Sequence, residues 1–290
     1  VACFTGGVDS FFTLLKHQDE ITSLVYVHGF DIPLTRTDAY EQTVAHLRTV
    51  ADDTGKNLIE MSTNLKSFLS SVRWGPIAHG PALASVAMLL TREHGTFLIP
   101  ATHTYSDSFP WGSHPLLDPL WSTENVAIVH DGAEATRVRK TVALGQSPVA
   151  QQHLRVCWKN TGAYNCGVCE KCYRTKICLR LAGTLGQFHT FEDPNVDPDV
   201  VRRIVIHNAN ALSFTVENRD FALEVGDVAI SEALNAAIAK YWRREPRTRQ
   251  LVRDKKRLVQ EIKSLRSRKS VRLADALGSL IAPVRRRKSS

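Results

Sequence analysis

The residues near the start of the chain have the types and spacing that bind phosphate. They read Phe4-Thr5-Gly6-Gly7-Val8-Asp9-Ser10. An apolar run precedes them and an amphipathic stretch follows, which predicts a strand, a tight turn and a helix. Gly6 and Gly7 leave the backbone open to an anion, and N–H groups at a helix start attract negative charge. We therefore predict that residues 4–10, with Phe4 and Val8 among them, hold the phosphates of a nucleotide.

Polar side chains within this turn extend that prediction. Thr5 and Ser10 offer hydroxyl groups, and Asp9 is a suitable ligand for the Mg²⁺ that accompanies a polyphosphate. No lysine follows the glycines, which excludes the G-x-x-x-x-G-K-[ST] loop, and the dinucleotide motif G-x-G-x-x-G is also absent. An ordinary strand-to-helix turn with two glycines is the alternative interpretation.

A second group with chemical potential is a cluster of four cysteines. Cys157, Cys166, Cys169 and Cys172 have the spacing C-x8-C-x2-C-x2-C. Four thiolates satisfy tetrahedral zinc with no open position, which predicts a structural site that helps its segment to fold. An iron–sulfur cluster is the competing interpretation. The other two cysteines, Cys3 and Cys178, are expected to be small buried residues.

The glycine turn resembles the S-G-G-x-D-S signature of the PP-loop ATP pyrophosphatases, with Thr5 in the place of the first serine. The cysteine spacing and the order of motifs over residues 1–185 are similar to those of the 7-cyano-7-deazaguanine synthases within that family. The resemblance implies that ATP adenylates a carboxylate or amide, that pyrophosphate leaves, and that ammonia gives an amide or nitrile. It also implies Mg²⁺ and a structural zinc ion as cofactors.

The same resemblance implies roles for residues outside the turn. It places Val27 and Arg137 beside the nucleotide, and it gives Lys140 a catalytic role together with Asp9 and Ser10. Solvent-exposed helix charges are the alternative for Arg137 and Lys140. The sequence departs from the family around residues 103–121, where the usual substrate loop is not found, so the acceptor stays open. Two further functions also stay open: sulfur transfer onto tRNA, and a non-catalytic ATP-binding scaffold.

These residues require a framework of alternating strands and helices. Apolar runs predict strands at 21–30, 56–61, 96–102 and 126–129, and helical spacing predicts helices at 40–54, 81–92 and 133–144. Such alternation is typical of a doubly wound parallel sheet in an α/β fold. Ligands of such sheets bind beyond the carboxyl ends of the strands, where the polar and aromatic loop 103–115 is expected.

The remaining sequence divides by composition. We predict a nucleotide-binding domain at 1–187 that includes the zinc segment 157–172, and a helical supporting region without chemistry at 188–241, with helices at 200–210 and 227–241. Residues 242–290 form a basic tail, helical or partly disordered. The net charge is +8, and residues 240–290 contain 18 basic and 4 acidic side chains.

Composition also sets expectations about partners and location. Leucines at 251, 258 and 265 indicate an amphipathic helix within the basic tail. Such a tail is expected to contact an acidic membrane surface, nucleic acid or a partner protein, and a homodimer is a further possibility. Few, clustered cysteines and the lack of a recognisable signal peptide favour a cytoplasmic location. The expected small-molecule partners are ATP and a carboxylate-bearing acceptor.

Overall fold

The computed structural model describes residues 1–107, 110–159 and 163–267. The chain forms two compact units, of which the first is Val1–Ala237 and the second begins at Ile238. Within the described residues, no helix combines the length and hydrophobicity that a membrane crossing requires.

Five parallel strands form the sheet of the first unit. They are β1 (Ala2–Cys3), β2 (Ser23–His28), β3 (Asn57–Ser62), β4 (Thr96–Pro100) and β5 (Ala127–Asp131), in the order β3-β2-β1-β4-β5. The central strand β1 pairs with β2 on one side and β4 on the other. The chain thus runs outward from β1 to β3, crosses back, and continues outward from β4 to β5. This reversal creates a crevice between β1 and β4, the usual place for a ligand in such sheets.

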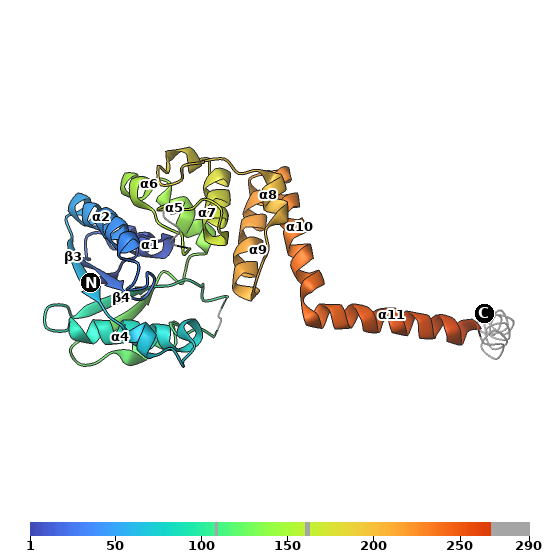
Figure 1. The fold of residues 1–290 in the computed structure, drawn as a ribbon, viewed down its shortest axis with the longest axis horizontal. Coiled ribbons are helices and arrows are strands. Elements are labelled where there is room, and N and C mark those ends of the chain that lie inside the picture. Colours follow the sequence, from blue (N-terminus) through green and yellow to red (C-terminus); the bar gives the residue numbers. More distant parts are fainter. Residues whose placement is uncertain (108–109, 160–162, 268–290) are drawn as a thin grey trace, which may run out of the picture. The chain divides into compact units, whose positions relative to one another are not determined.

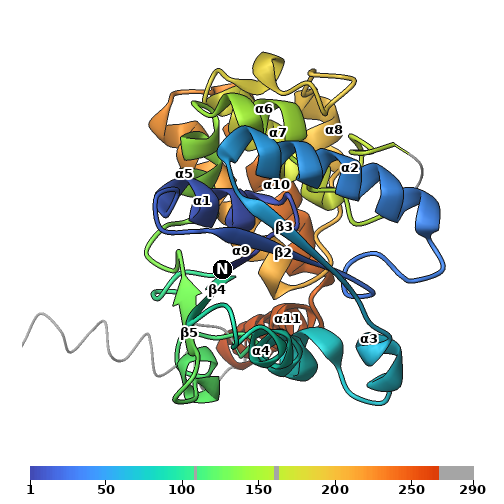
Figure 2. The same cartoon turned by 90° about the vertical axis from the view of Figure 1, so that its left-hand side faces the viewer.

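Helices cover both faces of this sheet, which confirms the predicted α/β class (Figures 1 and 2). One face carries α1 (Val8–Lys16), α2 (Thr37–Thr54), α5 (Arg137–Leu144), α6 (Pro148–His153) and α7 (Glu170–Leu181), and the other carries α3 (Leu65–Phe68), the π-helical turn Trp74–Ala78 and α4 (His79–Leu89).

Alternate strand residues supply the two cores between these layers. Phe4 and Tyr26 belong to the core below α1 and α2, whereas Cys3 and Val27 belong to the core below α4. Both sides of the central strands are therefore sealed by apolar packing, so the open ends of the strands are left for a ligand.

Helix boundaries follow local capping. Gly55 ends α2 in the left-handed conformation, with φ of 65°, directly after the predicted helix 40–54. The helix predicted at 133–144 begins only at Arg137, because the Thr136 side chain accepts a hydrogen bond from the backbone N–H of Arg139 and caps it there.

One predicted helix is wrong. The stretch 200–210 contains the end of α8 (Pro198–Arg203) and the start of α9 (Ala209–Glu224). Asn208 separates them, because its side chain accepts a hydrogen bond from the Ala211 N–H and starts a new helix. The next helix, α10 (Val228–Arg244), ends within the second unit.

The second unit also contains α11 (Pro246–Ser267). This is the helix that the leucine spacing predicts, and the side chains of Leu251 and Leu258 are exposed on it. The rest of the predicted basic tail, residues 268–290, lies outside the described residues.

Candidate functional site

A pocket of about 530 Å³ opens at the carboxyl ends of β1, β2 and β4. Gly7, Val27 and Pro100 are among its lining residues, so it occupies the crevice where the strand order reverses. Its charged lining comprises five basic side chains and three acidic ones, which are Lys66, Arg137, Arg155, Lys171, Arg174, Asp9, Asp31 and Glu170. This excess of positive charge suits an anionic ligand.

The two glycines of the turn have different roles. Gly6 has φ of 72°, and a side chain there would lie 3.2 Å from Leu47, so this glycine allows the turn to form and to pack. Its carbonyl also accepts a hydrogen bond of 2.7 Å from the backbone N–H of Arg155. Gly7 lines the pocket, with only ordinary contacts around its missing side chain. Gly7 is therefore the glycine of the turn whose bare backbone borders the pocket.

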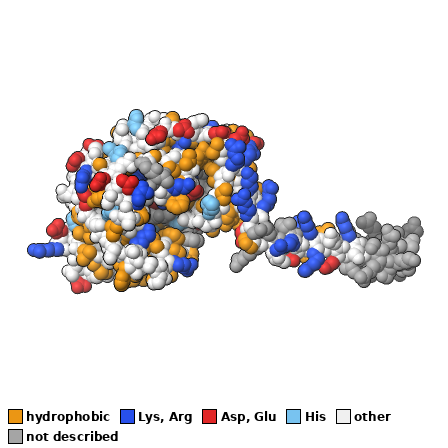
Figure 3. Space-filling view, viewed as in Figure 1, with side chains coloured by type: hydrophobic (Ala, Val, Ile, Leu, Met, Phe, Trp, Pro, Cys, Tyr) orange, Lys and Arg blue, Asp and Glu red, His pale blue; other side chains and the backbone are white. Residues whose placement is uncertain are grey.

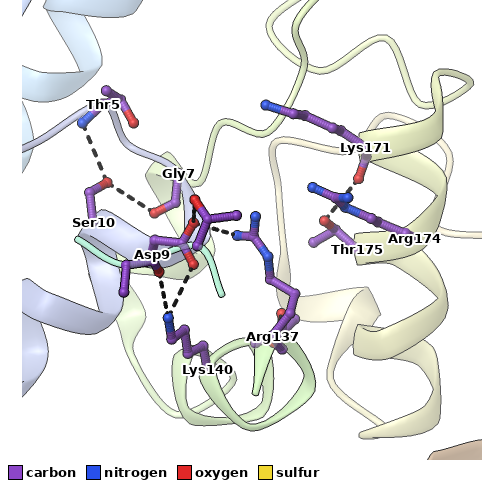
Figure 4. Close-up of polar contacts among 12 residues, drawn as sticks. Thr5, Gly7, Asp9, Ser10, Arg137, Lys140, Lys171, Arg174 and Thr175 are labelled. Atoms are coloured by element: carbon purple, nitrogen blue, oxygen red, sulfur yellow. Dashed lines mark hydrogen bonds and ion pairs between the residues drawn. The ribbon is translucent and has the colours of Figure 1, made fainter. Parts of the chain in front are cut away.

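Hydrogen bonds within the turn fix its shape (Figure 4). The Ser10 hydroxyl donates to the Gly7 carbonyl at 3.1 Å and accepts from the Thr5 N–H at 3.3 Å. Gly7 caps α1 without a side-chain hydrogen bond, so the first turn of that helix offers backbone N–H groups at the pocket. Phe4 is fully buried, and its ring packs edge-on against Phe11 with centroids 5.0 Å apart, so only its backbone belongs to the turn.

Asp9 is the electrostatic centre of the site. Its carboxylate lies 3.1 Å from Arg137 Nη1 and 3.5 Å from Lys140 Nζ, and it accepts a hydrogen bond of 3.4 Å from the Thr102 hydroxyl (Figure 4). Burial alone would raise the pKa of Asp9, but the charges of Arg137 and Lys140 outweigh burial and hold that pKa below its usual value. Asp9 is therefore ionised at neutral pH.

Lys140 is buried behind Asp9. Its side chain is 1% exposed, and its Nζ donates to the Ala101 carbonyl at 2.6 Å. Burial lowers the pKa of Lys140, and the negative charge of Asp9 opposes this change. The structure thus brings Arg137 and Lys140 to the same carboxylate, with Arg137 in the pocket lining and Lys140 supporting Asp9 from below.

Two further basic residues reach the pocket from α7. Lys171 and Arg174 lie three residues apart, on one side of the helix, and their side chains extend toward the turn in Figure 4. The Arg174 guanidinium donates to Glu170 at 3.2 Å, and burial lowers the pKa of Arg174 to about 10, so it stays charged at neutral pH. The sequence holds a signal for this pair, because Lys171 stands between Cys169 and Cys172 and Arg174 lies two residues after Cys172, but neither is among the residues predicted above.

Residues from the start of α9 also line the pocket, within the region 188–241 for which the sequence predicts only a supporting role. The Phe214 ring lies 4.1 Å from the Arg174 guanidinium and 5.3 Å from that of Arg137, and Asn208 and Asn210 also line the pocket. Phe214 thus holds two cationic groups in place through its ring face. No sequence signal indicates this placement, because it depends on how α9 packs against α7.

The opposite wall of the pocket is aromatic. Trp74, His79 and Trp111 line it, and the Trp111 indole packs directly over Gly75, where a side chain would clash. Burial lowers the pKa of His79, so its imidazole favours the neutral form. A planar or apolar group of a ligand would fit against this wall.

The four cysteines meet at one point. Their sulfur atoms all lie within 4.8 Å of one another, so they could hold a metal ion. The Sγ atoms of Cys166 and Cys172 are 3.9 Å apart, close to the roughly 3.8 Å that tetrahedral coordination with zinc–sulfur bonds of about 2.3 Å would give. A hydrogen bond from Cys172 lowers the pKa of Cys169 to about 5, which favours the ligating thiolate.

Local structure shapes the cysteine segment around this point. Gly167 has φ of 68° in the turn between two cysteines, and the Asn165 side chain accepts hydrogen bonds from the N–H groups of Val156 and Cys157. Cys157 also lines the pocket, so the cysteine cluster adjoins the candidate ligand site. Cys3 and Cys178 are buried outside the group of four, as the sequence predicts.

The glycine turn, the start of α5 with Arg137 and the cysteine segment are thus neighbours around one pocket. The predicted residues that line it are Thr5, Gly7, Val8, Asp9, Ser10, Val27, Arg137 and Cys157. Comparisons of the chain with protein-family models, with curated proteins and with solved structures found no match.

Proposed function

We propose that this protein is an ATP pyrophosphatase of the PP-loop type, which adenylates a carboxylate or amide acceptor. The observation that carries the proposal is the arrangement around Asp9. A glycine turn at the reversal of strand order presents an ionised carboxylate, and Arg137 and Lys140 both lie within 3.5 Å of it. Backbone N–H groups and cationic side chains are the groups that bind and stabilise a transferring phosphate.

Each part of the pocket has a role in this proposal. The backbone of Gly7 and of the first turn of α1 would bind the phosphates, and Arg137 would offset charge on the departing pyrophosphate. Among the described residues, the buried Asp9 Oδ1 atom has no hydrogen bond partner and only the ion pair with Lys140 at 3.5 Å. This suits a carboxylate that exchanges its ion pairs for the Mg²⁺ carried by ATP. That ion would supply further charge neutralisation on the phosphates.

The acceptor would enter from the side of α7. Lys171 and Arg174 offer positive charge for an acceptor carboxylate, and Trp74 and Trp111 offer apolar surface for the rest of it. A carboxylate oxygen would attack the α-phosphorus, and the bond to the β-phosphate oxygen would break to release pyrophosphate. Ammonia would then attack the acyl carbon and displace AMP, which leaves an amide after the nitrogen loses a proton.

The four cysteines fit a structural zinc ion in this proposal. Four sulfur ligands close the coordination sphere, so no position is open for a substrate. The ion would hold the segment from which Lys171 and Arg174 reach the pocket.

The experiment measures AMP and pyrophosphate formed from ATP, with ammonium and a panel of carboxylates as acceptors. Asp9→Asn should reduce the rate roughly 100-fold or more, because it removes the charge that orients Arg137 and Lys140 and that would hold Mg²⁺. The matched control is Asp19→Asn, an exposed aspartate that follows α1, which should leave the rate unchanged.

The proposal fails if Asp9→Asn equals the parent or if the product is ADP and phosphate. Metal analysis of the purified protein distinguishes the proposed function from sulfur transfer onto tRNA. Zinc is expected in the cysteine cluster, whereas iron there would favour sulfur transfer onto tRNA.

A further inference from the structure

Helix α11 (Pro246–Ser267) exposes a row of large aliphatic side chains. Leu251 is 68% exposed, Leu258 52% and Ile262 49%. Leu258 lies 7 residues after Leu251, and Ile262 lies 11 residues after it. In a helix with 3.6 residues per turn, the three side chains therefore project within about 40° of one another. Val259 is 43% exposed and widens the row. We call these four residues the apolar stripe of α11.

The same helix is strongly basic. Its sequence contains eight Lys or Arg and two acidic residues, Asp254 and Glu261. Arg257 lies 3.8 Å from each of these carboxylates and balances part of their charge. Basic side chains are visible along α11 in Figure 3. The helix therefore combines an apolar stripe with a large net positive charge, within the unit that does not contain the pocket.

We propose that α11 binds the surface of an anionic lipid membrane, with its apolar stripe inserted among the acyl chains near the headgroups. A basic helix with one apolar face lies in the plane of such an interface, where aliphatic side chains enter the lipid and Lys or Arg side chains contact the anionic headgroups. Trp242, 47% exposed in the same unit, has the type of side chain that is enriched at this depth.

Lys255 favours lipid over a second copy of the helix. It lies four residues after Leu251 and three before Leu258, so it projects from the same side of the helix as the stripe. Packing two copies through the stripe would bury this charge, whereas at a lipid surface its long side chain reaches the headgroups. Nucleic acid would satisfy the basic residues but would leave the aliphatic row in water. Lipid is the partner that satisfies both features.

The experiment measures binding of the full chain to phosphatidylcholine vesicles with and without phosphatidylglycerol. The parent should bind the anionic vesicles only, and added salt should weaken binding. The triple variant Leu251→Gln, Leu258→Gln and Ile262→Gln keeps helix-forming residues and should reduce binding roughly tenfold or more. The matched control is Met88→Gln, Leu89→Gln and Leu120→Gln, which alters three exposed apolar residues of the first unit and should bind as the parent does.

Three results would overturn this proposal. One is equal binding of the parent and the stripe variant, and another is equal binding to neutral and anionic vesicles. The third is self-association, or binding to an RNA oligonucleotide, that the stripe variant abolishes in the absence of lipid. ATP turnover is a separate readout, since the pocket lies in the first unit.

Discussion

Two regions flank the pocket, and they are held in place by different forces. The turn wall, Thr5–Ser10, joins the central strand to α1 and is fixed by hydrogen bonds of its own. The cysteine wall, residues 155–159 and 163–175, has four convergent sulfur atoms at its centre. The two walls meet where the Arg155 N–H donates to the Gly6 carbonyl at 2.7 Å. The turn wall should therefore form with the sheet, whereas the cysteine wall should depend on a metal ion bound by its four cysteines.

The largest expected effect comes from removal of the metal. Structural zinc sites supply an apparent binding free energy of roughly 10–16 kcal/mol, so Cys169→Ser or a strong chelator should unfold the cysteine wall. We expect proteases to cleave within 163–175 and nucleotide affinity to fall. Most of the circular dichroism signal of the full chain should persist. Cys178→Ala, which changes a buried cysteine outside the cluster, should retain the metal. Equal protease resistance with and without metal would show that the cysteine wall does not depend on a metal ion.

The next effect concerns the contact between the cysteine wall and α9. Phe214 is 2% exposed and packs on Arg174 and Arg137, so Phe214→Ala should lower the free energy of unfolding by about 3–5 kcal/mol and weaken ATP binding. Phe214→Leu keeps much of the packing but loses the aromatic face. Relative to Phe214→Ala, it should restore more of the stability than of the ATP affinity. Urea unfolding and nucleotide titration separate the two effects. Equal recovery of both would show that the ring acts through packing alone.

A smaller effect distinguishes the two glycines within the turn wall. Gly6→Ala should destabilise the protein by about 1–2 kcal/mol, because a side chain is strained at φ of 72°. Gly7→Ala has only ordinary contacts around its new methyl group, so it should fold normally and lose nucleotide affinity instead. Thermal melting and ATP titration of both variants provide the measurement, and the reverse pattern would refute these assignments.

The smallest effect is a pH dependence where α2 meets α6. His46 Nδ1 lies 2.8 Å from His153 Nδ1, and burial lowers the pKa of both imidazoles below the ordinary value of about 6.5. The neutral forms are favoured in the folded state, so this contribution to stability is complete above that value. It is lost as the pH falls through the lowered pKa values.

The test follows urea unfolding between neutral and mildly acidic pH. His46→Asn should flatten the decline in stability relative to the parent, because it removes one of the two groups whose protonation opposes folding. His189→Asn serves as the control outside this contact. An unchanged slope in His46→Asn would assign the pH dependence to other groups.

The fold was predictable to the extent that it depends on short stretches of sequence. Apolar runs located the five strands of the sheet, and glycine and threonine positions explain where two helices end or begin. The boundary at Asn208 was missed because one side-chain cap outweighed a continuous helical pattern. The convergence of the four cysteines was also predictable, since all four lie within 16 residues of sequence.

The pocket was predictable only in part. The sequence indicated the turn and the basic residues of α5. It missed the second pair of basic residues, Lys171 and Arg174, and the aromatic contact of Phe214. These groups come from helices whose positions are set by packing against other helices. A period in the sequence indicates which face of a helix is buried, but not which helix it meets.

The sequence by itself determined the strand, turn and helix at residues 2–16, the four cysteines and the concentration of basic charge after residue 240. Each of these features depends only on residues that are close to one another in the sequence. Only the tertiary structure decided that Asp9 meets both Arg137 and Lys140 and that Phe214 closes the same pocket. Those contacts join distant segments, and the packing of both faces of the sheet selects them.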